Sequence, residues 1–167
     1  MTEAELFLLV GQLVPADGII DIGTLEEAVE APGAYALILH LAVPVRFSRT
    51  GMASGSLSGW YVYAGSARGS GGIRARLRHH FRRGKPVHWH VDELTNVTDR
   101  IIALAFPQGS ECDVVDRLLR SGRFKPAIQG FGSSDCKRCP AHLLRPVQDT
   151  HHALWTPAHS SRIALAN

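Results

Sequence analysis

The sequence lacks several features that would define other classes of protein. No apolar run among its 167 residues reaches the roughly 18 residues of a membrane-spanning helix, which excludes such a helix. The segment 1–5 carries two acids and no base, and no small-residue cleavage site follows it, so we expect no secretory signal. Three cysteines are too few, and an odd number, for a disulfide scaffold. We therefore expect a cytoplasmic protein with reduced thiols.

Basic residues are absent from the beginning of the chain. Residues 1–32 contain seven acids and no lysine or arginine, whereas residues 33–167 hold all 18 bases and only eight acids. Seven of those bases lie between Arg68 and Lys85, a stretch without an acid. Such concentrated charge is typical of a surface that binds an anion, and nucleic acid is the usual one, although a solvated basic face is the alternative. A further hypothesis is that the acidic segment folds over the basic face and competes with DNA.

The length of the chain predicts one domain, because domains commonly hold about 100–200 residues. We find no internal repeat and no low-complexity tract. The charge pattern suggests an acidic N-terminal extension (1–32), a main domain (33–146) and a C-terminal tail (147–167).

Hydrophobic periodicity predicts both helices and strands. Helical spacing covers Glu3–Leu13 and Glu111–Arg120, and the second helix follows a capping box that begins at Ser110. A second capping box, Thr24–Glu27, predicts a short helix. The turn Ala42–Pro44 would pair Val45–Ser48 with the strand before it, and the glycine- and serine-rich Met52–Ser58 should be a loop. We expect strands or extended segments at Gly33–Val43, Val45–Ser48, Gly59–Gly65, Val87–Leu94, Ile101–Phe106 and Leu143–Arg145.

One further helix is predicted over Gly72–Arg83. Its apolar residues recur every four positions and form a core face, so the remaining positions make two polar stripes. The core face consists of Ile73, Leu77 and Phe81, one polar stripe of Arg74, Arg78 and Arg82, and the other of Arg76, His80 and Arg83.

All three tyrosines of the chain lie near the ends of two predicted strands. Gly33-Ala-Tyr35 opens one strand, and Tyr63-Ala-Gly65 closes the other, in which Tyr61 shares a face with Tyr63. If the two strands pair, the tyrosines converge on one patch. Half-buried tyrosines are also common in ordinary strands, so the pattern alone leaves both interpretations open.

Taken in order, Gly33-Ala-Tyr35, Tyr63-Ala-Gly65, Arg76 on a helix, and Glu111 on a later helix resemble the GIY-YIG nuclease family. The resemblance is closest to its small stand-alone members, the Uri-type endonucleases, and covers about Gly33–Leu144. It implies an α+β fold in which a small antiparallel core sheet of three strands is flanked by helices.

The resemblance also implies an activity. The protein would be an endonuclease that hydrolyses phosphodiester bonds of DNA, branched or damaged DNA included, with one Mg²⁺ or Mn²⁺ ion. Tyr35 would be the general base or hold the attacking water, supported by Tyr63. Arg76 would hold the phosphate, for which its planar fork is suited, and Glu111 would bind the metal, since hard cations prefer carboxylate oxygens. His80 would take part in proton transfer or phosphate binding. The residues expected to contact DNA are Arg68, Arg74, Arg78, Arg82, Arg83, Lys85, His88 and His90.

The asparagine that many family members carry late in the site has no clear counterpart after Glu111. This difference keeps an alternative open, namely a nucleic-acid-binding module of the same fold without catalysis.

A second group of residues suggests other chemistry. Cys136, Cys139 and His142 have the spacing of three zinc ligands, which Asp135 or a distant histidine such as His151 or His152 would complete. A redox pair of cysteines and ordinary structural thiols are the other interpretations. Either a zinc site or a redox pair would make the chain a metal or redox protein. Cys112 is expected to be a core thiol.

Overall fold

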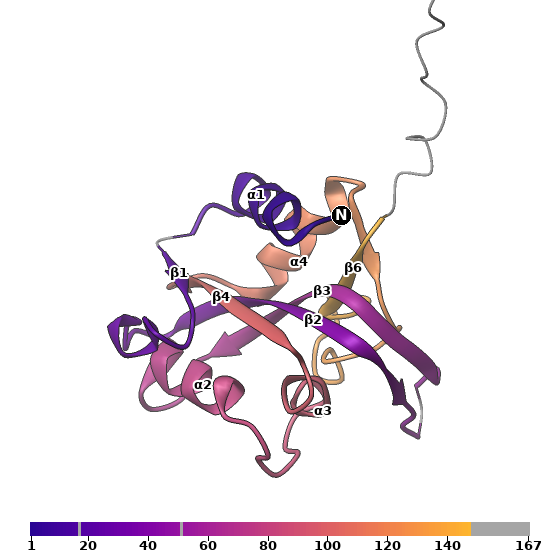
Figure 1. The fold of residues 1–167 in the computed structure, drawn as a ribbon. Helices are drawn as coiled ribbons and strands as arrows, with labels where there is room; N and C mark the ends of the chain where they lie inside the picture. The colour runs from indigo at the N-terminus through magenta and orange to yellow at the C-terminus, as the bar shows by residue number, and fades with distance from the viewer. Residues whose placement is uncertain (17, 51, 148–167) are drawn as a thin grey trace, which may run out of the picture.

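The core of the computed structural model is one six-stranded antiparallel sheet, seen in Figure 1. The structure describes residues 1–16, 18–50 and 52–147. The strand order is β1-β4-β2-β3-β6-β5. The strands are β1 (Ile19–Ile20), β2 (Gly33–Phe47), β3 (Gly55–Ala67), β4 (Arg100–Pro107), β5 (Phe124–Pro126) and β6 (Leu143–Pro146).

The α+β class is confirmed, but the expected number of strands is wrong. The central strands β4, β2 and β3 correspond to the three that the resemblance implied, and β1, β6 and β5 extend the sheet on either side. These three additional strands span only two to four residues each. A segment that short shows no measurable alternation of apolar and polar residues, and of the three only β6 was expected.

The β2–β3 hairpin is longer than the sequence suggested. The strand β2 continues to Phe47, and its register against β3 shifts between Leu41 and Val45. The turn predicted at Ala42–Pro44 is therefore wrong, because this stretch is a bulge in one strand. A bulge tolerates a proline, since the missing N–H interrupts a ladder that is already broken. The predicted loop is also too long, because β3 begins at Gly55.

Two pairs of helices cover the two faces of the sheet (Figure 1). Helices α1 (Glu3–Leu13) and α4 (Glu111–Arg120) pack on one face, and α2 (Gly72–Phe81) and the short α3 (Asp92–Thr95) pack on the other. Alternate residues of β2 enter the two cores: Leu37 lies in the core with α2, and Ile38 in the core with α1 and α4. The structure thus has a three-layer arrangement of helix, sheet and helix.

Several predicted elements have the expected bounds. Helices α1 and α4 begin and end where they were predicted, and α2 ends two residues earlier, at Phe81. The capping box at Ser110 does not form, whereas Thr2 and Glu5 make one on α1. Thr24–Glu27 gives only a 3-10 turn, Leu25–Glu27.

The segment Val87–Leu94 forms no strand, contrary to the prediction: it is irregular at first, turns at residues 89–91 and then enters α3. None of the described helices is long and apolar enough to cross a membrane.

The acidic segment 1–32 is part of this fold rather than an extension of it. Strand β1 pairs with β4, and Leu6 and Val10 of α1 are fully buried against the sheet and α4. The predicted C-terminal tail lies outside the described residues after Val147, as do His151 and His152.

Candidate active site and neighbouring cysteine cluster

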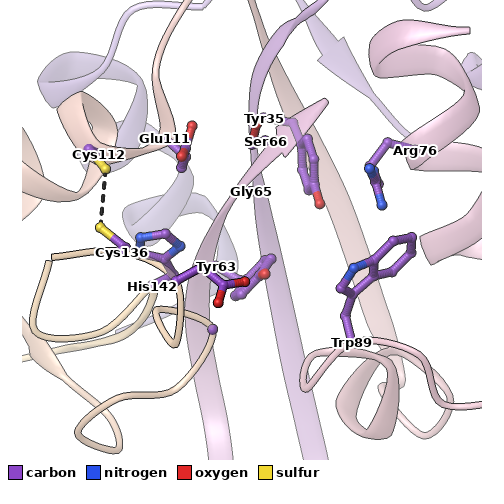
Figure 2. Close-up of a pocket in the computed structure, with 12 residues that line it drawn as sticks. Tyr35, Tyr63, Gly65, Ser66, Arg76, Trp89, Glu111, Cys112, Cys136 and His142 are labelled. Atoms are coloured by element: carbon purple, nitrogen blue, oxygen red, sulfur yellow. Dashed lines mark hydrogen bonds between the residues drawn. The ribbon is translucent and has the colours of Figure 1, made fainter. Parts of the chain in front are cut away.

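A cavity of about 410 Å³ lies where β2 and β3 meet the beginning of α4. Figure 2 shows its two walls, which face each other. We call the first the sheet-side wall, formed by Tyr35, Tyr63, Gly65, Ser66, Arg76 and Trp89. The second, the loop-side wall, is formed by Glu111, Cys112, Gly132, Asp135, Cys136 and His142. The structure therefore brings together four of the five predicted catalytic residues.

The two short motifs meet because their strands pair in register. Tyr35 lies directly opposite Gly65, as expected from strand pairing. A Cβ atom on residue 65 would lie 2.2 Å from Cζ of Tyr35, so only glycine leaves room for the ring. Tyr63 belongs to the same core as Tyr35, whereas Ala64 points into the other core. The glycine of the second motif thus holds the tyrosine of the first.

His80, the fifth predicted residue, lies behind the cavity. Its Nε2 is 2.7 Å from the hydroxyl of Tyr35, and its side chain is only 1% exposed. His80 Nδ1 lies 3.5 Å from Oδ1 of Asp92, and Nε2 of His79 lies 3.0 Å from the same oxygen. The other oxygen of Asp92 accepts hydrogen bonds from the backbone N–H groups of His88 and Trp89. His80 therefore acts on the cavity only through Tyr35.

Burial sets the protonation states in this network. It raises the pKa of Tyr35 well above its usual value, more than nearby Arg76 lowers it, and raises the pKa of Tyr63 to about 12. Burial also lowers the pKa of His80 to about 4, although Asp92 opposes the shift. For Asp92, burial would raise the pKa, but the hydrogen bonds it accepts hold it well below its ordinary range. At neutral pH both tyrosines and His80 are uncharged and Asp92 is ionised.

Arg76 supplies the positive charge of the cavity. Its guanidinium carbon lies 4.0 Å above the ring centroid of Trp89, a cation–π contact, and Figure 2 shows the group beside Tyr35. Within the described part of the chain, no carboxylate forms an ion pair with it. Arg76 is thus held by stacking while its donors remain open to an anion.

The loop-side wall contains buried polar atoms without partners. Glu111 comes from the first turn of α4, and its Oε2 has no hydrogen-bond partner among the described residues. The same holds for Nε2 of His142, whose carbonyl accepts a hydrogen bond from Ala64. Leaving such a group unpaired costs about 1–3 kcal/mol. A bound cation would satisfy both kinds of atom.

The cysteine cluster lies beside this wall. Cys112 of α4 is half-buried, with its sulfur 3.5 Å from that of Cys136, so the expectation of a core thiol is wrong. Helical periodicity correctly predicted that Cys112 lies on α4. It could not predict the contact with Cys136, which lies in a loop 24 residues further along the chain. The ligand atoms of Cys112, Cys136, Cys139 and His142 all lie within 4.8 Å of one another.

Two of the predicted DNA-contacting arginines are paired with the acidic segment. Arg74 lies 2.7 Å from Glu30 and also donates to the carbonyl of Ala28, and Arg78 forms an ion pair with Glu26. The acidic segment thus contacts the arginine helix, as hypothesised. Whether it competes with DNA remains a prediction.

Three other predicted DNA contacts make hydrogen bonds within the protein. Lys85 is only 4% exposed, and its ammonium donates to Thr95 and to backbone carbonyls at the end of α2, so it is not a surface cation. Arg83 donates to the carbonyls of Thr95 and Thr98. His90 accepts a hydrogen bond from the backbone of Gly132. The predicted DNA contacts that are exposed and form no ion pair among the described residues are Arg68, Arg82, Arg83 and His88.

A protein-family model described as a domain of unknown function, DUF123, matches residues 34–162. The chain belongs to the DUF123 family. No curated protein and no solved structure matches it with significance. The DUF123 match includes both walls of the cavity and every ligand atom of the cysteine cluster.

Sequence reasoning did not place Trp89 at this site, and it considered Asp92 only as part of a metal-binding edge with His88 and His90. Both lie in the segment predicted to be a strand, where the alternation of His88, Trp89 and His90 suggested one polar face. The sequence carries no usual signal for the contacts of Asp92, because aspartate in a turn commonly accepts backbone N–H groups later in the chain, whereas Asp92 accepts those of His88 and Trp89 before it. Such an aspartate is held rigidly and can orient a histidine.

Proposed function

We propose that this protein is a metal-dependent endonuclease that hydrolyses phosphodiester bonds of DNA. The observation that carries the proposal is the convergence of Tyr35, Tyr63, Arg76 and Glu111 on one cavity. Phosphodiester hydrolysis needs an oriented water and positive charge at the phosphoryl oxygens, and this cavity offers groups suited to both. The resemblance to GIY-YIG nucleases rests on the same four residues and supports the same activity.

Tyr35 would orient the water and pass on its proton. Because the pKa of Tyr35 is raised, the side chain is a neutral phenol at neutral pH rather than a phenolate, and its hydroxyl is hydrogen-bonded to His80. As water attacks phosphorus, its proton would move to the Tyr35 oxygen while the hydroxyl proton moves to Nε2 of His80. The carboxylate of Asp92 beside His80 would stabilise the imidazolium that forms. Solvent would protonate the oxygen of the leaving strand.

Arg76 and Glu111 would neutralise the developing charge. The guanidinium offers paired donors to two phosphoryl oxygens, and its stacking on Trp89 limits the entropy lost on binding. Glu111 fits the role of metal ligand, because its buried Oε2 has no partner among the described residues. Magnesium sites often use one or two carboxylates and fill the other positions with water and substrate phosphate. When bound, the cation would supply charge neutralisation at the phosphate.

Beyond the cavity, DNA would lie along the exposed basic residues Arg68 and Arg82. Binding should be steeply salt-dependent, with a slope near −0.9 for each phosphate neutralised on a duplex.

A cleavage assay tests the proposal. Purified protein is incubated with supercoiled plasmid, single-stranded DNA and a branched duplex, with Mg²⁺, Mn²⁺ or a chelator. We expect metal-dependent cutting that Glu111→Gln and Arg76→Ala each reduce by about 100-fold or more. Tyr35→Phe should reduce cutting with little loss of DNA binding, because it removes only the hydroxyl.

Matched controls lie on α4, away from the cavity. Asp116→Asn and Arg120→Ala change an exposed ion pair and should leave cutting unchanged. If no substrate is cut but salt-sensitive binding remains, the alternative of a binding module without catalysis is correct. Cutting that survives both Glu111→Gln and Arg76→Ala would contradict the site.

A further inference from the structure

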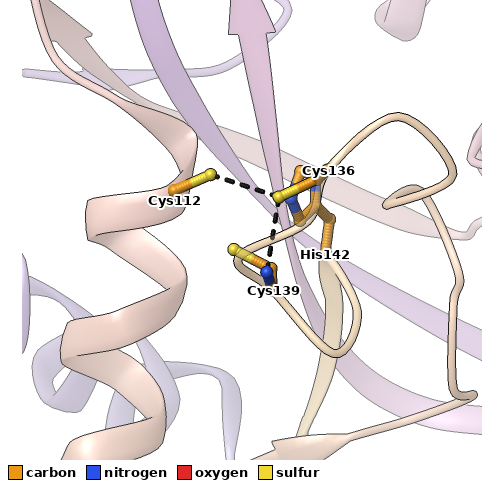
Figure 3. A group of neighbouring side chains, drawn as sticks. All are labelled: Cys112, Cys136, Cys139 and His142. Carbon is orange, nitrogen blue, oxygen red and sulfur yellow. Dashed lines mark hydrogen bonds between the residues drawn. The ribbon is translucent and has the colours of Figure 1, made fainter.

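The cysteine cluster draws its four side chains from two separate segments (Figure 3). Cys112 lies in the first turn of α4, and the other three come from the loop between β5 and β6, residues 127–142. The sulfur atoms and one ring nitrogen of His142 lie within 4.8 Å of one another. All three cysteines of the chain are in this cluster.

The spacing of these atoms suits a shared metal ion better than a disulfide. The sulfurs of Cys112 and Cys136 are 3.5 Å apart, well beyond the roughly 2.05 Å of a disulfide bond. Around a tetrahedral zinc ion with Zn–S bonds of about 2.3 Å, neighbouring sulfurs lie about 3.8 Å apart. A disulfide would also leave one cysteine and the histidine without a role, whereas a tetrahedral ion uses all four groups.

A backbone donor favours a thiolate at Cys136. The backbone N–H of Cys139 lies 3.3 Å from the sulfur of Cys136 and donates to it, which stabilises negative charge there. Arg138 lies close enough to Cys112 and Cys139 to attract their thiolates, although it also pairs with Asp113. His142 has a buried Nε2 without a hydrogen-bond partner among the described residues.

The loop is joined to the core by the buried side chains of Ile128 and Phe131 but has no regular structure. Residues 127–142 contain no helix or strand, and loops this long without regular structure are uncommon inside a compact domain. Yet this loop forms much of one wall of the cavity, including Gly132 and Asp135. An ion shared with Cys112 would join the loop to α4 at the residue next to Glu111.

We propose that Cys112, Cys136, Cys139 and His142 bind one structural Zn²⁺ ion that fastens the 127–142 loop to the start of α4. A site of three cysteines and one histidine is closed, with four protein ligands and no open position, so its function is structural rather than catalytic. On binding, the three thiols release their protons to solvent, and no oxidation is involved. The proposal does not depend on the nuclease activity.

Metal content is the direct test. The full chain is expressed with zinc in the medium, purified under reducing conditions and analysed by mass spectrometry for metals. We expect about one zinc per chain, lost in Cys112→Ser and Cys139→Ser and retained in Lys137→Ala, a change in the same loop. Cys112→Ser is the decisive variant, because the three ligands visible in the sequence are all still present in it.

Two further measurements apply even if a variant fails to fold. Cobalt added to the zinc-free wild-type chain should give the strong thiolate-to-metal absorption and visible bands of a tetrahedral site. Zinc should also protect all three thiols from a thiol reagent, and a chelator should expose them and lower the melting temperature by about 5 °C or more. A chain that binds neither zinc nor cobalt, or that forms a disulfide between Cys112 and Cys136 under these reducing conditions, overturns the proposal.

Discussion

The two walls of the cavity are built in different ways. On the sheet-side wall, Tyr35 packs on Gly65 and its hydroxyl is bonded to His80, so paired strands and side chains fix its position. On the loop-side wall, Glu111 and His142 keep buried polar atoms that no described residue satisfies. The first wall is thus positioned by strand pairing and packing, whereas the second leaves two buried polar atoms that bound cations would satisfy. Four predictions test this difference.

The largest effect is expected where the sheet-side wall is most tightly packed. Gly65→Ala would place a methyl group 2.2 Å from the Tyr35 ring, which must then move. We expect a loss of about 3 kcal/mol in the free energy of unfolding, measured by urea denaturation, because overpacking of a buried site typically costs 1–3 kcal/mol or more.

Gly69→Ala is the matched control, since a Cβ there meets nothing within 4 Å. The double variant Tyr35→Ala with Gly65→Ala should lose less stability than the sum of the two single changes, because the clash is gone. An additive result would show that Gly65 does not hold Tyr35.

Acid should weaken the sheet-side wall through His80. The pKa of His80 in the folded chain is about 4, below the usual 6.5. Between pH 4 and pH 6.5, His80 therefore binds a proton in the unfolded chain but not in the folded chain. Stability is therefore full above about pH 6.5 and falls as the pH drops toward 4. The expected loss between pH 7 and pH 5 is about 2 kcal/mol.

Denaturation curves at several pH values measure this loss. His80→Gln should flatten the dependence between pH 7 and pH 5, whereas His88→Gln, a change at an exposed histidine, should leave it unchanged. An equal pH dependence in wild type and His80→Gln would contradict the neutral buried histidine.

Metal removal should separate the two walls directly. With a zinc chelator present, we expect amide hydrogen exchange in residues 127–142 to rise by about tenfold or more, equivalent to about 1.4 kcal/mol of local stability. Exchange in β2 and β3 around Tyr35 should stay constant, because pairing holds these strands without an ion. Equal acceleration in both regions would mean that the walls form one cooperative unit.

The same contrast explains what the sequence revealed. Gly33, Tyr35, Tyr63 and Gly65 lie on strands whose apolar patterns are long enough to predict, and pairing in register then brings them together. The position of Glu111 in the first turn of α4 was also predictable, because the bounds of this helix were predicted correctly. The edge strands β1 and β5 were missed because two or three residues carry no periodicity.

The loop-side wall was beyond such reasoning. Cys112 meets Cys136 only through the tertiary path of a loop without regular structure, and no spacing along the chain encodes that contact. Likewise, the partners of Arg74 and Arg78 lie in the acidic segment 1–32. The charge of this segment was evident from the sequence, but its path across α2 was not.

The smallest effect is expected at these arginines, where part of the charge on the sheet side is already neutralised. Glu26→Gln combined with Glu30→Gln would free Arg78 and Arg74 without disturbing the buried α1, which a deletion of residues 1–30 would remove. If DNA crosses this face, affinity at low salt should rise a few-fold, and the salt dependence should steepen by up to about two units, near 0.9 for each freed contact. Fluorescence anisotropy with a labelled duplex measures both quantities, and Asp116→Asn, which removes one negative charge on the opposite face, serves as the control. Unchanged affinity and slope would show that DNA binds elsewhere. Exposed ion pairs are weak, so an arginine released from one would strengthen DNA binding if it contacted the DNA.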